Sequence, residues 1–96
     1  MNSQKTESRV HIIVSGIVQG VFFRAKTKEA ADRLKVSGWA KNKKDGTVEI
    51  IAEGNKDSVD HLVKWCRLGP QGAVVKDLKL TQEEYRGEFN SFNIIY

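Results

Sequence analysis

The amino-acid sequence predicts a two-layer α+β domain, in which two helices pack together on one face of a mostly antiparallel sheet. Apolar residues alternate with their neighbours in segments near both ends of the chain and in its middle, which is the period of a half-buried strand. Two further segments carry residues at the three- and four-residue spacing of a helix with one buried face. The 96 residues fall within the size range of one domain and leave no room for a second core.

The first strand is predicted where Val10, Ile12 and Val14 alternate with the residues between them. Residues 1–8 are polar and lack the apolar stretch that a secretory signal requires. We therefore expect a disordered tail at residues 1–8 and one folded domain at residues 9–96.

A loop with two glycines, at residues 16–21, follows the first strand and runs directly into the first helix. The residues at the offsets of one helical face are Phe23, Thr27, Ala30, Ala31 and Leu34. Gly38 is expected to end this helix, because glycine readily adopts the left-handed conformation found after helix ends.

A hairpin is predicted next, with strands at residues 39–42 and 47–53. Residues 43–46 join the two strands, and Asp45 followed by Gly46 is a strong signal for a tight turn.

The second helix is expected to begin after Asn55, which is suited to cap it, and to end at Gly69 and Pro70. Its buried stripe consists of residues at helical spacing, namely Val59, Leu62, Val63 and Cys66. Two more strands are indicated by looser alternation, the first with Val74, Lys76, Leu78 and Leu80 and the second with Phe92, Ile94 and Tyr96. This order, βαββαβ with a closing strand, predicts the ferredoxin-like split βαβ arrangement.

Composition narrows the possible partners and compartments. The formal net charge is +4, but Lys and Arg alternate with Asp and Glu instead of forming a basic block, which suits a small anionic substrate as well as nucleic acid. The single cysteine cannot form an intramolecular disulfide, and no apolar run approaches the ~20 residues that span a bilayer. We expect a cytoplasmic monomer without a membrane partner.

The segment from Gly16 to Arg24 has the character of an anion site. A loop between a strand and a helix directs unpaired N–H groups and the positive end of the helix dipole at one point, which suits a phosphate. Arg24, in the first helical turn, adds a planar fork of donors that can bind two phosphate oxygens at once. The competing interpretation is an ordinary turn followed by a surface arginine.

The second candidate residue is Asn42, which is placed late in a predicted strand although asparagine is a poor strand former. Its amide offers a donor and an acceptor, so it can accept a hydrogen bond from a water and donate one to an anion. The competing interpretation is that Asn42 merely begins the turn.

Together the two segments resemble both signatures of the acylphosphatase family. The first signature, glycine-any-valine-glutamine-glycine-valine-any-phenylalanine-arginine, is filled without a gap from Gly16 to Arg24. The second is filled by Gly38, Trp39, Asn42, Asp45, Gly46, Val48 and Glu49. The likeness covers residues 10–96, and Ala40, where the family commonly has valine, is a small departure that bears on packing.

The resemblance implies a fold, an activity and a site. The family's phosphate-binding loop corresponds to Gln19, Gly20, Val21, Phe22 and Phe23. Its phosphate-binding arginine corresponds to Arg24, and its water-orienting asparagine to Asn42. The implied activity is hydrolysis of the carboxyl-phosphate bond of a small-molecule acyl phosphate, without a cofactor or a metal.

These residues suit an acyl phosphate as substrate. Its leaving group is a carboxylate, whose conjugate acid has a pKa near ~4, so it departs at neutral pH without being protonated. A general acid is then dispensable, and the enzyme must only hold the phosphoryl group, neutralise its charge and place a water in line. A phosphate oxygen is expected to accept the proton of the water, since neither signature contains a histidine or a cysteine.

Other reactive side chains favour structural roles. Cys66 lies on an apolar helical stripe, and His11 and His61 lack ligand-spaced partners, so no metal site is predicted. Asp45 and Glu49 are explained by turn chemistry and a solvated strand face.

Two other functions fit parts of the pattern. An RNA-binding module of the same fold would place aromatic residues centrally on two strands, whereas Phe22, Phe23 and Trp39 precede or begin elements, so no nucleic-acid partner is expected. The second alternative is an acylphosphatase-like domain that handles carbamoyl phosphate, as in larger carbamoyl-transfer proteins.

Overall fold

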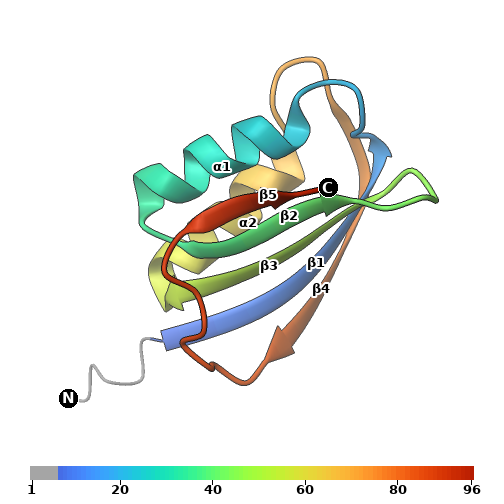
Figure 1. The fold of residues 1–96 in the computed structure, drawn as a ribbon. Coiled ribbons are helices and arrows are strands. Elements are labelled where there is room, and N and C mark those ends of the chain that lie inside the picture. The colour runs from blue at the N-terminus through green and yellow to red at the C-terminus, as the bar shows by residue number, and fades with distance from the viewer. Residues whose placement is uncertain (1–6) are drawn as a thin grey trace.

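The computed structural model describes residues 7–96 and shows one five-stranded sheet with two helices on the same face (Figure 1). The elements are β1 (Glu7–Ile17), α1 (Phe23–Leu34), β2 (Ser37–Asn42), β3 (Val48–Asn55), α2 (Lys56–Leu68), β4 (Val74–Glu83) and β5 (Phe92–Ile95). The strands are ordered β4-β1-β3-β2-β5, and each pairs with its neighbour antiparallel except β2 and β5, which are parallel. The predicted ferredoxin-like two-layer fold is confirmed.

The core lies between the helices and the sheet, where the predicted alternation brings one face of each strand. Val10, Ile12 and Val14 of β1 are at most 2% exposed. The predicted stripe of α2, formed by Val59, Leu62, Val63 and Cys66, is buried against them. Burying a large aliphatic side chain contributes roughly 1.5–3 kcal/mol, so these faces drive the two layers together.

Both helices start and end with identifiable backbone features. Asn55 caps α2 as predicted, since its side chain accepts a hydrogen bond from the Asp57 N–H at 3.0 Å. The prediction that Gly38 ends α1 is wrong, because Lys35 adopts the left-handed conformation there. Gly38 lies within β2, where a Cβ atom would stand 1.9 Å from the carbonyl oxygen of Ile51, so close strand packing requires glycine.

The sheet begins slightly earlier than expected. β1 starts at Glu7, so Glu7 and Ser8 belong to the first strand and not to a tail. Residues 1–6, the rest of the expected disordered tail, lie outside the described residues.

Three strands have their C-terminal ends at the same end of the sheet. β1 and β2 both run antiparallel to β3, and β5 runs parallel to β2. The C-terminal ends of β1, β2 and β5 therefore lie on the same side, and Figure 1 shows the chain's C-terminus there, near the start of α1.

A buried charge cluster holds the connection from β4 to β5, residues 84–91. The Glu53 side chain is buried and accepts hydrogen bonds from the backbone N–H groups of Arg86, Gly87 and Glu88 at 2.9, 3.1 and 3.0 Å. Arg9, also buried, pairs with Glu53 at 3.0 Å. Burial raises the pKa of Glu53, but the N–H of Arg86, the Arg9 guanidinium and the other two N–H groups outweigh it and hold the pKa below its usual value.

Candidate active site

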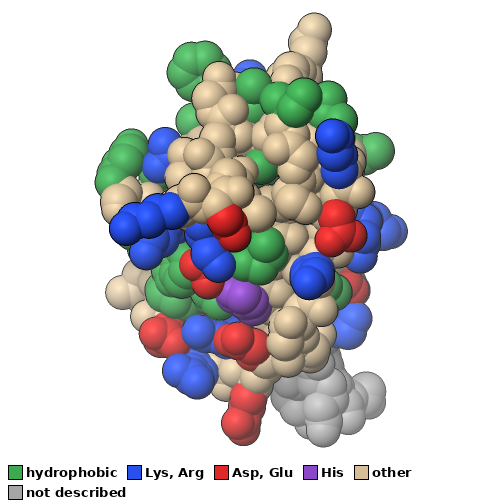
Figure 2. Space-filling model, turned by 90° about the vertical axis from the view of Figure 1, so that its right-hand side faces the viewer, with side chains coloured by type: hydrophobic (Ala, Val, Ile, Leu, Met, Phe, Trp, Pro, Cys, Tyr) green, Lys and Arg blue, Asp and Glu red, His purple; other side chains and the backbone are tan. Residues whose placement is uncertain are grey.

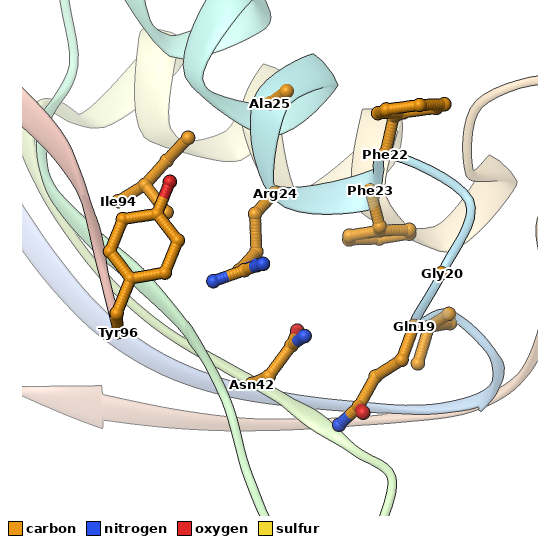
Figure 3. Close-up of a pocket in the computed structure, with 10 residues that line it drawn as sticks. Gln19, Gly20, Phe22, Phe23, Arg24, Ala25, Asn42, Ile94 and Tyr96 are labelled. Atoms are coloured by element: carbon orange, nitrogen blue, oxygen red, sulfur yellow. The ribbon is translucent and has the colours of Figure 1, made fainter.

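A pocket of about 470 Å³ opens at the edge where β1, β2 and β5 end. Its walls come from the loop before α1, the first turn of α1, the end of β2 and the C-terminal segment (Figure 3). The lining residues are Val18, Gln19, Gly20, Phe22, Phe23, Arg24, Ala25, Asn42, Ile94 and Tyr96.

The structure brings together most of the residues that the sequence singled out. Gln19, Gly20, Phe22, Phe23, Arg24 and Asn42 all line the pocket. Val21 does not, because its half-buried side chain packs against the core. The Phe23 side chain is also committed to the core, 1% exposed and with its ring 5.9 Å from that of Trp65.

The loop presents backbone donors that have no other use. Among residues 7–96, no hydrogen bond is donated by the backbone N–H groups of residues 19–24. Phe22 precedes α1 in the left-handed conformation, with φ 60°, and provides no side-chain cap. The first turn of α1 contains no acidic residue, so the positive end of the helix dipole remains available to an anion.

Arg24 extends from α1 into the pocket (Figure 3). None of the ion pairs between described residues includes Arg24. Its guanidinium stands 4.9 Å from the centre of the Tyr96 ring, and Nη1 donates to the carbonyl oxygen of Ile95 at 3.5 Å. Neither contact partner is an anion, so the positive charge of the guanidinium is not neutralised by a neighbour and can attract an anionic ligand.

Asn42 faces Arg24 from the last residue of β2 (Figure 3). The strand continues up to Asn42, whose register partner is Val48, so the residue is anchored by the sheet before the turn begins. Its side-chain oxygen Oδ1 is buried and accepts no hydrogen bond from the described residues. A buried acceptor without a partner costs roughly 1–3 kcal/mol, and a catalytic role is one of the reasons for which a protein retains such an atom.

The Gln19 side chain turns toward the β2–β3 hairpin and away from Arg24 (Figure 3). Its amide nitrogen donates to the carbonyl oxygens of Lys43 and Thr47, both at 2.8 Å. Within the predicted phosphate-binding set, Gln19 therefore offers the pocket its backbone and not its amide.

Sequence reasoning missed Ile94 and Tyr96 as pocket residues. The alternation in residues 92–96 indicated a strand but carried no information about its partner. The parallel pairing of β5 with β2 is what places this segment beside Arg24.

The other reactive side chains lie outside the pocket. Cys66 is buried in α2, and burial raises its thiol pKa to about 12. His11 pairs with Glu49 at 2.8 Å, and Asp45 accepts hydrogen bonds from Thr47 in the turn. No group of three His, Cys, Asp or Glu side chains within residues 7–96 is placed to hold a metal ion.

The molecular surface shows how the charges are distributed. Figure 2 shows basic and acidic side chains interspersed on the face in view, without a continuous basic field. No helix of the described residues is long and apolar enough to cross a membrane.

Comparison with known proteins identifies a family for this chain. The family model described as acylphosphatase matches residues 10–94. An acylphosphatase of Pyrobaculum calidifontis is 52% identical over 88 residues, which are 91% of this chain and 80% of the relative. One of Syntrophus aciditrophicus is 50% identical over 88 residues, 92% of each chain. The solved structure of an acylphosphatase from Coxiella burnetii superimposes with a TM-score of 0.90 at 35% identity and covers 99% of each chain.

Proposed function

The chain belongs to the acylphosphatase family and is an enzyme that hydrolyses acyl phosphates, and we propose that it does so in the pocket between α1 and the ends of β2 and β5. The observation that carries the proposal is the pairing of an unopposed cation, Arg24, with an unpartnered buried acceptor, Asn42, beside a row of free backbone N–H groups.

The phosphoryl group is bound by backbone N–H groups of residues 19–24 and by the Arg24 guanidinium. The backbone donors and the helix dipole are fixed before substrate arrives, so they stabilise added charge without reorganisation. Arg24 contributes two parallel donors to phosphate oxygens, and its contact with Tyr96 keeps the guanidinium at the pocket wall.

The attacking water is held by Asn42. When substrate binds, the Asn42 side chain turns Oδ1, which is buried in the free enzyme, toward the water that it holds. Oδ1 then accepts a hydrogen bond from the water and directs the water's lone pair at phosphorus, on the side opposite the leaving carboxylate. The new bond forms between the water oxygen and phosphorus, the bond between phosphorus and the carboxyl oxygen breaks, and the electron pair leaves with the carboxylate. A phosphate oxygen takes the proton of the water.

The reaction needs neither a metal nor a general acid in this scheme. The carboxylate leaves without protonation, because a carboxylic acid has a pKa near ~4. Positioning and charge stabilisation are the remaining requirements, and the pocket residues meet both.

We further propose a small-molecule acyl phosphate as the substrate and a cytoplasmic monomer as the working form, with no nucleic-acid or membrane partner. The single cysteine and the interspersed charges support this assignment. A domain specialised for carbamoyl phosphate is the alternative, and the pocket lining, with Phe22, Ile94 and Tyr96 among its residues, favours a larger acyl group.

The test is release of inorganic phosphate from three compounds: benzoyl phosphate, carbamoyl phosphate and phenyl phosphate. We expect turnover of benzoyl phosphate and none of phenyl phosphate, whose leaving phenoxide is far more basic than a carboxylate (a phenol pKa is about 10). Turnover of carbamoyl phosphate alone would support the alternative. Turnover of phenyl phosphate at a similar rate would contradict the proposed chemistry, because it would require a general acid.

A further inference from the structure

We propose that Gln19 is a positioning residue, whose side chain fixes Asn42 relative to the phosphate-binding loop; the inference rests on the function proposed above for that loop and for Asn42. The amide of Gln19 donates two hydrogen bonds of 2.8 Å, one to the carbonyl oxygen of Lys43 and one to that of Thr47. A single side chain of the loop thus contacts the first and the last residue of the connection between β2 and β3, directly beside Asn42.

These two bonds reach the hairpin immediately beyond Asn42. Lys43 follows Asn42 in the chain, and Thr47 precedes Val48, the register partner of Asn42. The Lys43 N–H donates to the Thr47 carbonyl at 2.9 Å, so the two acceptors of Gln19 are themselves held side by side. Any movement of the loop against the hairpin must stretch the contacts of Gln19 before it changes the position of Asn42.

No other hydrogen bond performs this task in the described part of the chain. The hydrogen bonds of Gln19 are the ones that join residues 18–22 to residues 42–47. The ladder between β1 and β3 ends at the pair Val14 and Val48, so the sheet does not hold the loop to the hairpin turn. The relative placement of the two halves of the pocket depends on Gln19.

The same geometry separates Gln19 from direct phosphate binding. Its amide nitrogen has two N–H groups, and both are occupied by hairpin carbonyls. Figure 3 shows the side chain directed away from Arg24, so contact with a phosphate on Arg24 would require breaking both bonds. Gln19 therefore acts through Asn42. Loss of the Gln19 side chain should lower turnover without weakening the binding of phosphate by the loop and Arg24.

The first experiment compares Gln19→Met with the parent, because methionine has a similar length and no donor. A misplacement of about 1 Å at a reacting centre can cost roughly 100-fold in rate, so we expect kcat for benzoyl phosphate to fall at least ~10-fold. The inhibition constant for inorganic phosphate should stay within about threefold, since the loop N–H groups and Arg24 are untouched. Gln71→Met is the matched control, because Gln71 is exposed and lies outside the pocket.

The second experiment combines Gln19→Met with Asn42→Ala. If Gln19 acts through Asn42, the double variant should turn over no more slowly than Asn42→Ala alone, because the effects of coupled residues are not additive. Gln19→Asn, which is one methylene too short to reach the hairpin, should resemble Gln19→Met in every assay.

Three results would overturn the inference: unchanged kcat in Gln19→Met, a fully additive double variant, or a rise in the phosphate inhibition constant as large as that of Arg24→Ala. A failure of the proposed function looks different, since it would leave Asn42→Ala itself with full turnover. If Asn42→Ala is slow and Gln19→Met is not, only the positioning role is wrong.

Discussion

Replacing Asn42 by alanine should separate the chemistry of the pocket from the stability of the fold. The variant removes the amide that we assign to the attacking water and leaves the loop and Arg24 intact. A group that positions the water acts mainly in the transition state, whereas the groups that bind phosphate act in the ground state as well. We therefore expect a large loss in kcat with little change in phosphate binding.

The magnitudes follow from the surroundings of the side chain. One preorganised polar contact at a reacting centre is worth about 2.7–4 kcal/mol, which corresponds to a fall in kcat of roughly 100- to 1,000-fold. In the free enzyme, however, Oδ1 of Asn42 is buried without a partner, which costs roughly 1–3 kcal/mol. Removing it should leave the protein as stable as the parent or stabilise it by about 1 kcal/mol, and that gain would raise the Tm by about 4–8 °C.

The assay is steady-state hydrolysis of benzoyl phosphate with inhibition by inorganic phosphate, together with thermal unfolding followed by circular dichroism. Asn90→Ala is the control, because Asn90 is exposed in the connection before β5 and makes no side-chain hydrogen bond among the described residues. Full turnover in Asn42→Ala would refute the water-positioning role. A strong fall in Tm would show instead that Asn42 mainly holds the hairpin.

Four further predictions concern phosphate binding, the metal-free reaction and the buried carboxylate of Glu53. Arg24→Lys keeps the charge but loses the two-pronged geometry, so kcat/KM for benzoyl phosphate should fall at least ~10-fold; a rate within twofold of the parent would reduce Arg24 to a point charge. Inorganic phosphate should inhibit competitively and raise the Tm, by an amount that corresponds to about 2.7 kcal/mol at 100 times its Kd. If saturating phosphate leaves the Tm unchanged, the loop is not the phosphate-binding site. Excess chelator should leave turnover unchanged, and activity that chelator abolishes and added metal restores would contradict the metal-free scheme. Because the pKa of Glu53 is held below its usual value, its contribution to stability is full at neutral pH and is lost as pH falls below about 4. The free energy of unfolding of Glu53→Gln should be about 1–3 kcal/mol lower than that of the parent at pH 7 and should depend less on pH in the acid range. Denaturant titrations at several pH values can check both expectations.

The fold could be predicted because its elements depend on local patterns. The alternation of Val10, Ile12 and Val14 and the stripe of α2 both face the core, and the cap at Asn55 forms as expected. The end of α1 was predicted wrongly, because glycine at position 38 serves close strand packing and not helix termination. Sequence alone does not distinguish these two uses of glycine.

Parts of the pocket were predictable for a similar reason, since Gly16 to Arg24 and the end of β2 carry their chemistry in contiguous residues. The contact of Tyr96 with Arg24 depends on the parallel pairing of β5 with β2, which no local pattern specifies. The direction of the Gln19 side chain likewise depends on where the hairpin turn lies in space. Tertiary placement, and not residue type, decides both.

The buried cluster around Glu53 was also beyond sequence reasoning. Arg9 and Glu53 each occupy a strand position that alternation assigns to the sheet face opposite the helices. They are buried because residues 84–91 fold back and donate three backbone N–H groups to one carboxylate. Such satisfaction of a charge by distant backbone is visible only in the folded chain.

In the proposed reaction, water attacks phosphorus in the pocket and not the acyl carbon. Hydrolysis of benzoyl phosphate in water enriched in oxygen-18, with mass analysis of both products, tests this claim directly. Attack at phosphorus, from a water held by Asn42 beside Arg24, places the heavy oxygen in inorganic phosphate and leaves benzoate unlabelled. Heavy oxygen in benzoate would contradict the account, because it would mean that the carbonyl carbon is the electrophile and that the phosphate grip serves another step.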